Sequence, residues 1–272
     1  MSDKLNNYFE NHRIIYYILN FLLIITILKS FQVYAYPNAN FSEVLTQGNI
    51  EFMLFGMKGE LGGLALTFYL AFMAIVLSFI FGSILGIARW GNVKIFSIPA
   101  TIFIEIFRAV PHIMVIFWVF FATPLMFALL FDIKVTSSAL TSAIVAFTLF
   151  ESAHIAEIVR AGLNSMPKGQ FEAAKTLGMN SWQTFTLIIL PQAYRRMIPP
   201  LVSQFVSLFK DTSLVYVIGV VEFFRASTII NNRVYMSFEI LSITAIIYFI
   251  CAFTLSQIAG NLEKKVEKQL NT

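Results

Sequence analysis

The stretch KGQFEAAKTLGMNSWQTFTLIILPQ, from Lys168 to Gln192, is polar and interrupted by glycine, although the sequence on both sides of it is strongly apolar. Its first part consists of good helix formers around Glu172, and Gly178 follows where a left-handed C-terminal cap would end a helix. Asn180 or Ser181 can cap a second helix through WQTFTLII, which we expect Pro191 to close. The stretch therefore predicts two short helices joined by a tight turn, outside the hydrocarbon layer.

The composition of the rest of the chain is that of a protein that crosses a membrane several times. Of its 272 residues, 58% are hydrophobic and only 12% are charged, which leaves too few polar side chains to cover a soluble globule of this size. Apolar runs that can cross about 30 Å of hydrocarbon lie at 14–36, 62–88, 99–130, 139–160, 198–221 and 239–260. We predict an all-α membrane protein with six transmembrane helices.

Lysine and arginine residues gather at one set of helix ends. One side collects Lys4, Arg13, Arg89, Lys94, Arg160, Lys168, Lys175, Arg195, Arg196, Lys264, Lys265 and Lys268, and the other has only Lys58, Lys134, Arg225 and Arg233. Because cytoplasmic loops carry the excess of positive charge, both termini and the stretch at 168–192 are expected in the cytoplasm.

Several classes of function are disfavoured. The net charge of +4 is spread in short groups at the ends of apolar runs, without the basic stripe and stacking aromatics that nucleic-acid binding requires. His12, His112 and His154 lie in separate segments without an HxxxH or HExxH spacing, so we predict no metal site. No GxxxxGK[ST] loop and no GxSxG elbow occur, so we expect neither a bound nucleotide cofactor nor catalysis in this chain.

The two helices predicted at 168–192 project apolar side chains beside charges. These are Phe171, Leu177, Met179 and Trp182. Such a surface suits docking to a soluble partner, and an amphipathic loop lying on the lipid headgroups is the alternative.

The spacing of the same stretch carries more information than its composition. Glu172-Ala-Ala-x3-Gly178-x9-Ile188-x-Leu190-Pro191 resembles the EAA loop of the permease subunits of ABC-type importers. The stretches FIEIFRAVP (103–111), AEIVRAGLNSMPKGQFEAAKTLGM (156–179), LPQAYRRMIPPL (190–201) and KDTSLVYVIGVVEFFRAS (210–227) resemble the polar amino-acid branch, the histidine, glutamine and glutamate permeases. The resemblance implies a type I ABC importer permease bundle whose coupling helix contacts an ATPase through Gly169, Glu172, Ala173, Ala174 and Gly178.

The resemblance also implies partners and a domain division. It implies two copies of an ABC ATPase that carry ATP and Mg, a second permease subunit (the same or a sister chain), an extracytoplasmic amino-acid-binding protein, and a bacterial inner-membrane location. It covers the chain from about Gly62 to the end, so we divide the chain into an added helix and loop at 1–61, a permease core at 62–260 and a cytoplasmic tail at 261–272. His154 departs from the family pattern, which leads us to expect an aromatic residue there.

Ionisable residues inside apolar spans are costly and are functional hypotheses by default. Glu105 and Arg108 are three apart and can pair, just before a kink at Pro111. They line a gate region or form an ion pair at a helix end. Glu151 and His154 form a second predicted pair, in which His154 contacts substrate or is a hydrogen-bonded packing residue.

The fifth span carries a third polar group. Gln204, Ser207 and Asp211 share one helix face and Lys210 lies beside it. Lys210 and Asp211 can answer the carboxylate and ammonium of an amino acid near mid-membrane, or they pair with neighbouring helices and hold the bundle together. The neutral amide of Gln204 favours glutamine, glutamate or aspartate over cationic substrates, by the family pattern.

Two other functional classes stay open from the sequence. An ion-coupled secondary carrier would use the same charges, although such carriers commonly show internal repeats and none is visible. A membrane scaffold that transports nothing would tolerate changes at Lys210 or Asp211.

Overall fold

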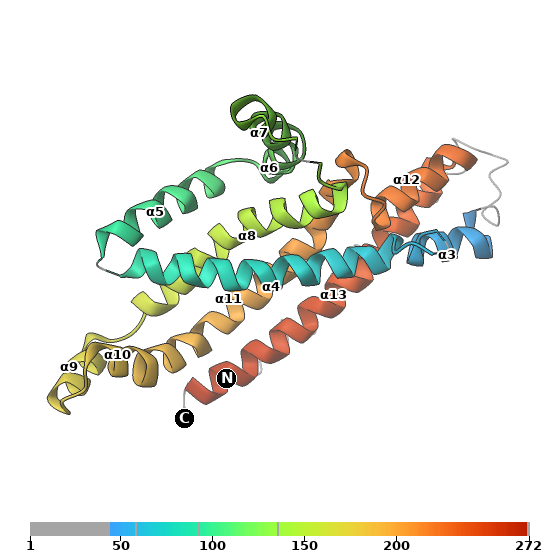
Figure 1. Ribbon diagram of the computed structural model, residues 1–272. Helices are drawn as coiled ribbons and strands as arrows, with labels where there is room; N and C mark the ends of the chain where they lie inside the picture. Colours follow the sequence, from blue (N-terminus) through green and yellow to red (C-terminus); the bar gives the residue numbers. More distant parts are fainter. Residues whose placement is uncertain (1–43, 58, 92, 135, 271–272) are drawn as a thin grey trace, which may run out of the picture.

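The computed structural model describes residues 44–57, 59–91, 93–134 and 136–270, and this part of the chain is helical without a strand (Figure 1). The first helices are α3 (Gln47–Phe55), α4 (Gly63–Trp90), α5 (Lys94–Ala109), α6 (His112–Phe117), the π-helix η1 (Trp118–Ala122), α7 (Thr123–Phe131) and α8 (Ala139–Asn164). They are followed by α9 (Lys168–Thr176), α10 (Ser181–Gln183), the π-helix η2 (Thr184–Ile189), α11 (Leu190–Asp211), the 3₁₀ helix η3 (Thr212–Ile218), α12 (Phe223–Val234) and α13 (Ser237–Leu270).

Five helical runs in the described residues are long and apolar enough to cross a membrane. They are Gly63–Trp90, His112–Phe131, Ala139–Asn164, Ser181–Ile218 and Ser237–Leu262. The all-α membrane fold is confirmed, and these runs correspond to five of the six predicted spans. The predicted span at 14–36 lies outside the described residues.

The third predicted span, 99–130, is wrong as a single helix. α5 ends at Ala109, Val110 is extended with φ −92° and ψ 139°, and α6 starts at His112. Pro111 explains the break, because it lacks a backbone N–H and excludes helical geometry for the residue before it. As a result α5 is a separate 16-residue helix that packs on α4 and α8, and the membrane-length run starts at His112.

The predicted stop at Pro191 is also wrong. Pro191 occupies the first turn of α11, and the helical run continues from α10 through η2 into α11 without interruption. Pro191 cannot donate a hydrogen bond to the preceding turn, but the wider π turns of η2 lie immediately before it, and such local π adjustments accommodate a proline within a helical run. The second helix of the cytoplasmic stretch is therefore the start of a spanning run.

The core of the bundle is the contact between α4 and α8. Two glycines one turn apart on α4, Gly82 and Gly86, face α8. A β-carbon on Gly82 would lie 2.6 Å from the carbonyl oxygen of Ser152, and one on Gly86 would lie 2.6 Å from that of Ala156. Small residues at this spacing allow membrane helices to pack backbone against backbone, so these glycines set the distance between the two helices.

The long helices run between two opposite ends of the molecule (Figure 1). The turn between α4 and α5 and the helices α9 and α10 lie at one end, and α3 and α12 lie at the other. α4, α8, α11 and α13 run between these ends. Residues from three of the predicted positive clusters, around Arg89, Lys168 and Arg196, therefore belong to the α9–α10 end.

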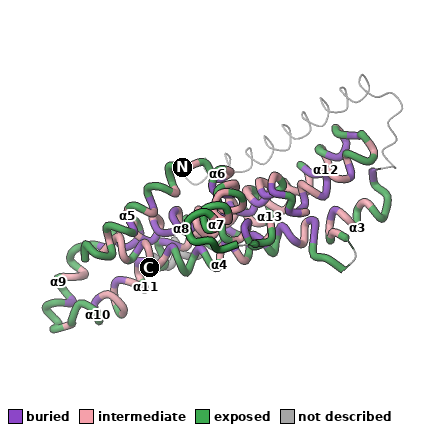
Figure 2. Tube along the Cα trace, turned by 45° about the horizontal axis from the view of Figure 1, so that its top comes forward, coloured by how far each residue is buried: buried purple, intermediate pink, exposed green. Residues whose placement is uncertain are grey.

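The outward sides of several helices are exposed (Figure 2), and many of the exposed side chains are large and apolar. Phe72 and Ile84 of α4 are 61% and 60% exposed, and Leu129 of α7 is 74% exposed. Exposed apolar area costs roughly 25 cal/mol per Å² in water, whereas lipid tails remove that cost. The distribution of apolar side chains is therefore that of a bundle surrounded by lipid or by a second subunit.

Candidate functional site

α9 begins after Pro167 and ends in a glycine cap. The N–H of Met179 donates to the carbonyl oxygen of Ala174 at 3.1 Å, and that of Gly178 donates to Lys175 at 3.0 Å. Gly178 has φ +75°. This is the Schellman pattern, in which the residue after the helix takes the left-handed conformation. The predicted cap at Gly178 is confirmed.

The second helix starts at the residue predicted from the sequence. The Asn180 side chain accepts a hydrogen bond from the N–H of Gln183 at 2.9 Å, and Gln183 Oε1 accepts one from the N–H of Asn180 at 3.0 Å. This reciprocal capping box satisfies two N–H groups of the helix start. The turn between α9 and α10 is thus fixed on both sides by local hydrogen bonds.

An aromatic contact attaches this helix pair to the bundle. Trp90, the last residue of α4, stacks on Phe185 of η2 with ring centroids 5.7 Å apart and lies 6.5 Å from Phe171 of α9. A buried apolar cluster continues inward from these rings, formed by Ile155, Val159, Leu163, Met166, Ile189, Ala193 and Met197. Packed side chains therefore connect α9 with α4, α8 and α11.

The outer surface of the helix pair is exposed. Leu177 and Trp182 are 78% and 72% exposed, as expected, whereas Phe171 and Met179 are half-buried. Of the predicted coupling residues, Glu172 and Ala173 face outward and Ala174 is buried. Nothing lies within 4 Å of a β-carbon placed on Gly169, so packing within this chain does not require glycine at that position.

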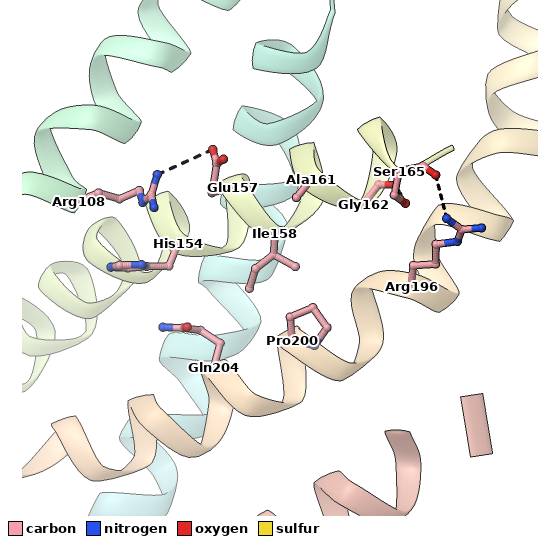
Figure 3. Close-up of a pocket in the computed structure, with 10 residues that line it drawn as sticks. All are labelled: Arg108, His154, Glu157, Ile158, Ala161, Gly162, Ser165, Arg196, Pro200 and Gln204. Atoms are coloured by element: carbon pink, nitrogen blue, oxygen red, sulfur yellow. Dashed lines mark hydrogen bonds and ion pairs between the residues drawn. The ribbon is translucent and has the colours of Figure 1, made fainter. Parts of the chain in front are cut away.

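A pocket of about 460 Å³ lies where α8 and α11 pass each other beside the end of α5 (Figure 3). Its lining residues come from all three helices: Arg108, His154, Glu157, Ile158, Ala161, Gly162, Ser165, Arg196, Pro200 and Gln204. Three of the predicted path residues, Arg108, His154 and Gln204, therefore share one cavity.

Two guanidinium groups lie at this pocket (Figure 3). Arg108 Nη1 is 4.0 Å from Glu157 Oε2, and Arg196 Nη1 donates a 2.8 Å hydrogen bond to the Ser165 carbonyl oxygen. Neither contact uses all five N–H donors of a guanidinium. Both side chains therefore retain donors for a ligand carboxylate.

An ion cluster flanks the pocket, and its pairing differs from the prediction. Among the described residues, Glu105 pairs with Arg89 at 2.6 Å rather than with Arg108. Glu157 is the shared acceptor, because Arg89 lies 3.2 Å from it and Arg160 donates to it through Nε and Nη2. The cluster joins the ends of α4, α5 and α8 across helices, whereas the sequence indicated a pair within one helix.

The predicted pair of Glu151 with His154 is likewise replaced by a contact between helices. Gln204 Nε2 donates a 2.7 Å hydrogen bond to Glu151 Oε2. His154 packs against the Phe150 ring with centroids 4.9 Å apart. The amide of Gln204 thus lines the pocket and links α11 to α8.

The remaining predicted residues of α11 lie elsewhere. Asp211 Oδ2 is 3.5 Å from His112 Nδ1 at the start of α6. Lys210 is exposed, and neither Lys210 nor Ser207 is among the residues that line the pocket. Lys210 and Asp211 therefore lie outside the lining of this pocket, and their predicted contact with substrate stays a prediction.

Arg196 was used in the sequence only to predict membrane orientation, although its spacing also indicates a place in the pocket lining. Arg196, Pro200 and Gln204 are spaced by four residues, which places them on one helix face. Extending the polar face of Gln204 toward the N-terminus of the helix would have included Arg196.

The family model described as "Binding-protein-dependent transport system inner membrane component" matches residues 78–268. The chain belongs to this family. The permease is 42% identical over 204 residues to the probable glutamine ABC transporter permease protein GlnP of Bacillus subtilis, which covers 74% of this chain and 90% of that protein. It is 35% identical to the glutamate/aspartate import permease protein GltK of Escherichia coli, over 75% of this chain and 92% of the relative.

Solved structures agree with the arrangement of the permease. The crystal structure of an amino acid ABC transporter with histidines matches with a TM-score of 0.68 at 29% identity, over 75% of this chain and 92% of that one. An inward-facing structure of the MetNI methionine ABC transporter matches with a TM-score of 0.56 at 19% identity, over 74% and 91% of the two chains, which supports the fold alone. The permease is an integral inner-membrane subunit of an ABC transport system, and the family match favours this function over an ion-coupled carrier.

Proposed function

We propose that this permease passes a polar amino acid, with glutamine, glutamate or aspartate favoured, along the pocket between α5, α8 and α11. The observation that carries the proposal is the pair of guanidinium groups, Arg108 and Arg196, in one cavity with the neutral side chain of Gln204. Arginine binds carboxylates through paired N–H donors. An amino acid that presents one or two carboxylates therefore finds donors on two sides of this pocket.

The named relatives support the same substrate class. One is called a glutamine permease and another a glutamate/aspartate permease. The amide of Gln204 is held by Glu151 at 2.7 Å, so it has a defined direction and adds no net charge to the cavity. This favours anionic and neutral polar substrates over cationic ones.

The energy for transport comes from a partner ATPase that carries ATP and Mg. Membership of an ABC permease family implies such a subunit, and the exposed surface of Glu172, Leu177 and Trp182 is the region we assign to its binding. Two ATPases, one on each of two permease subunits, would move α9 and α10 as a rigid unit. The contact of Trp90 with Phe185 would then carry the movement into α4.

The same assembly leads us to propose an orientation in the membrane. The α9–α10 end faces the cytoplasm, as the positive residues there favour, and both termini lie on that side. The opposite end, with α3 and α12, faces an extracytoplasmic amino-acid-binding protein. The second permease subunit, a copy or a sister chain, would complete the path.

Reconstitution in lipid of the permease with its ATPase and binding protein tests the function. We expect glutamine, glutamate or aspartate to stimulate ATP hydrolysis and uptake more than arginine, lysine or histidine. Stimulation by cationic amino acids alone would contradict the substrate assignment.

Docking is tested separately with Glu172→Arg, which reverses one exposed charge. We expect the variant to lose the ATPase during purification while its own melting temperature stays near that of the wild type. Lys94→Glu, a charge reversal at the same end of the bundle outside α9 and α10, is the control that should retain the ATPase. Uptake that continued without any ATPase would instead favour the ion-coupled carrier.

A further inference from the structure

Three side chains from distant parts of the sequence meet on one side of α8. His112 is the first residue of α6, Glu151 lies in the middle of α8, and Asp211 is the last residue of α11. One potential ligand atom from each lies within 4.8 Å of those of the other two. Their separation along the chain explains why no metal-binding spacing is visible in the sequence.

His112 is buried and held in place without a hydrogen bond. His112 is only 8% exposed, and neither ring nitrogen has a hydrogen-bond partner among the described residues. The ring stacks on Phe150 with centroids 3.9 Å apart and planes 5° apart, and it meets Phe147 edge-on at 4.7 Å. Packing therefore fixes the direction of two buried nitrogen atoms that have no hydrogen-bond partner among the described residues, which costs free energy unless something binds there.

Glu151 adds a buried oxygen in the same situation. The residue is fully buried, Oε2 accepts the hydrogen bond from Gln204, and Oε1 has no partner among the described residues. Metal-binding carboxylates are commonly oriented by a hydrogen bond from a neighbouring residue. Gln204 supplies that hydrogen bond and leaves Oε1 available.

Asp211 completes the group and opens it to a ligand. Its side chain is 39% exposed, and Oδ2 lies 3.5 Å from His112 Nδ1. Two ligand atoms that each lie about 2.0–2.2 Å from a tetrahedral zinc ion are separated by a distance of this order. The exposed side of Asp211 provides a route for an ion to enter.

We propose that His112, Glu151 and Asp211 bind a divalent transition-metal ion, for which Zn²⁺ is the best match. An imidazole nitrogen and carboxylate oxygens are ligands that zinc accepts, and its charge of +2 offsets two carboxylates that lie close together. The ligand atoms lie up to 4.8 Å apart, and rotation of the three side chains would bring them within bonding distance of one ion. The bound ion joins α6, α8 and α11, and water supplies the fourth ligand from the Asp211 side.

Zinc binding is measured on the nucleotide-free complex of permease and ATPase, purified without a histidine tag and without any amino acid. After treatment with a chelator, Zn²⁺ is titrated against a fluorescent zinc indicator. We expect one tightly bound Zn²⁺ per permease chain, and the visible spectrum of a Co²⁺-substituted sample should show a four-coordinate site. A wild-type complex that holds no Zn²⁺ in competition with the indicator would overturn the proposal whatever the fate of any variant.

Variants locate the ion. His112→Gln, Glu151→Gln and Asp211→Asn should each weaken Zn²⁺ binding by at least about tenfold, the loss that changes even outside the ligand set commonly cause. His154→Gln is the matched control on the same side of α8, and it should bind Zn²⁺ as the wild type does. Equal binding by the three variants would place the ion elsewhere and contradict the proposal.

The alternative cation for these carboxylates is the ammonium group of a substrate. If the wild type bound no Zn²⁺ while amino-acid-stimulated ATP hydrolysis fell in all three variants, the group would be an ammonium site and the metal proposal would be wrong. Because Zn²⁺ binding is measured without an amino acid, it fails or succeeds independently of the transport assignment.

Discussion

Gly86 of α4 faces the backbone of Ala156 on α8 so closely that a β-carbon at position 86 would lie 2.6 Å from the Ala156 carbonyl oxygen. Gly82 makes the same approach to Ser152 one turn earlier. α4 and α8 therefore pack backbone against backbone at these two glycines, and α8 also carries residues of the proposed path. A change in this spacing would displace His154 and Glu157 together.

Gly86→Ala should destabilise the permease. Overpacking of this kind typically costs 1–3 kcal/mol, and the gain of roughly 0.5–1 kcal/mol in helix propensity offsets part of it. We expect a lower melting temperature in detergent and reduced transport. Gly260→Ala is the matched control, because Gly260 lies in α13 with nothing within 4 Å of an added β-carbon, and it should be neutral or slightly stabilising. Equal melting temperatures for the two variants would show that α4 and α8 adjust without cost.

The local signals in the sequence predicted local structure well. Gly178 and Asn180 form the caps expected of them, because a left-handed residue and a capping side chain act over only a few residues. Proline was harder to interpret: Pro111 breaks a run that hydropathy alone joined, and Pro191 lies within a helical run that it was expected to end. The two prolines differ in the residues before them. Val110, before Pro111, is extended, whereas the π-helix η2 leads into Pro191.

Pairing between helices could not be predicted from spacing. Glu105 and Arg108 are correctly spaced for a pair within α5, yet Arg89 at the end of α4 is closer to Glu105. Gln204 was predicted to lie on a polar helix face, and Figure 3 shows its side chain at the pocket, but its partner Glu151 lies on another helix. Sequence periodicity gives the face of each helix, whereas the partner depends on how the helices cross.

Gly178 provides a test of the rigid coupling unit. Gly178→Val places a β-branched residue at φ +75°, which costs roughly 1–2 kcal/mol, so we expect weaker binding of the ATPase and lower transport-coupled ATP hydrolysis. Gly178→Asn should retain most of both, because asparagine tolerates the left-handed conformation. If both variants lost ATPase binding to the same extent, the glycine would be required for contact with the partner rather than for the turn.

Glu222 is expected to make stability depend on pH. It lies between the fourth and fifth spanning runs of the described chain, and burial raises its pKa from 4.5 to about 7 against the opposing hydrogen bonds from Phe224, Arg225 and Tyr248. Because the pKa is raised, the contribution of the protonated Glu222 carboxyl to the free energy of unfolding is fully present below about pH 4.5 and is lost as the pH rises through 7. The loss amounts to at most about 3 kcal/mol.

The Glu222 prediction is measured as a difference between two proteins, because other groups also titrate. The free energy of unfolding of Glu222→Gln minus that of the wild type should rise between about pH 5 and pH 8. The variant also loses an acceptor oxygen that faces a backbone N–H, and this lowers its free energy of unfolding by a constant amount at every pH. A difference that does not change with pH would contradict the assignment of a neutral carboxyl at Glu222.

Arg196 provides the sharpest test of the proposed path, because the chain supplies a neighbouring control. Arg196→Gln removes a guanidinium that lines the pocket, and a hydrogen bond to a charged group contributes roughly 1.5–3 kcal/mol. We therefore expect kcat/KM for glutamate-stimulated ATP hydrolysis to fall by about tenfold or more, with a smaller loss for glutamine, which has one carboxylate fewer. Arg195→Gln changes the exposed arginine beside it, which is not among the residues that line the pocket, and should leave both substrates near wild-type values. Equal losses for glutamate in the two variants would mean that Arg196 acts through the overall positive charge at this end of the bundle rather than by contact with the substrate.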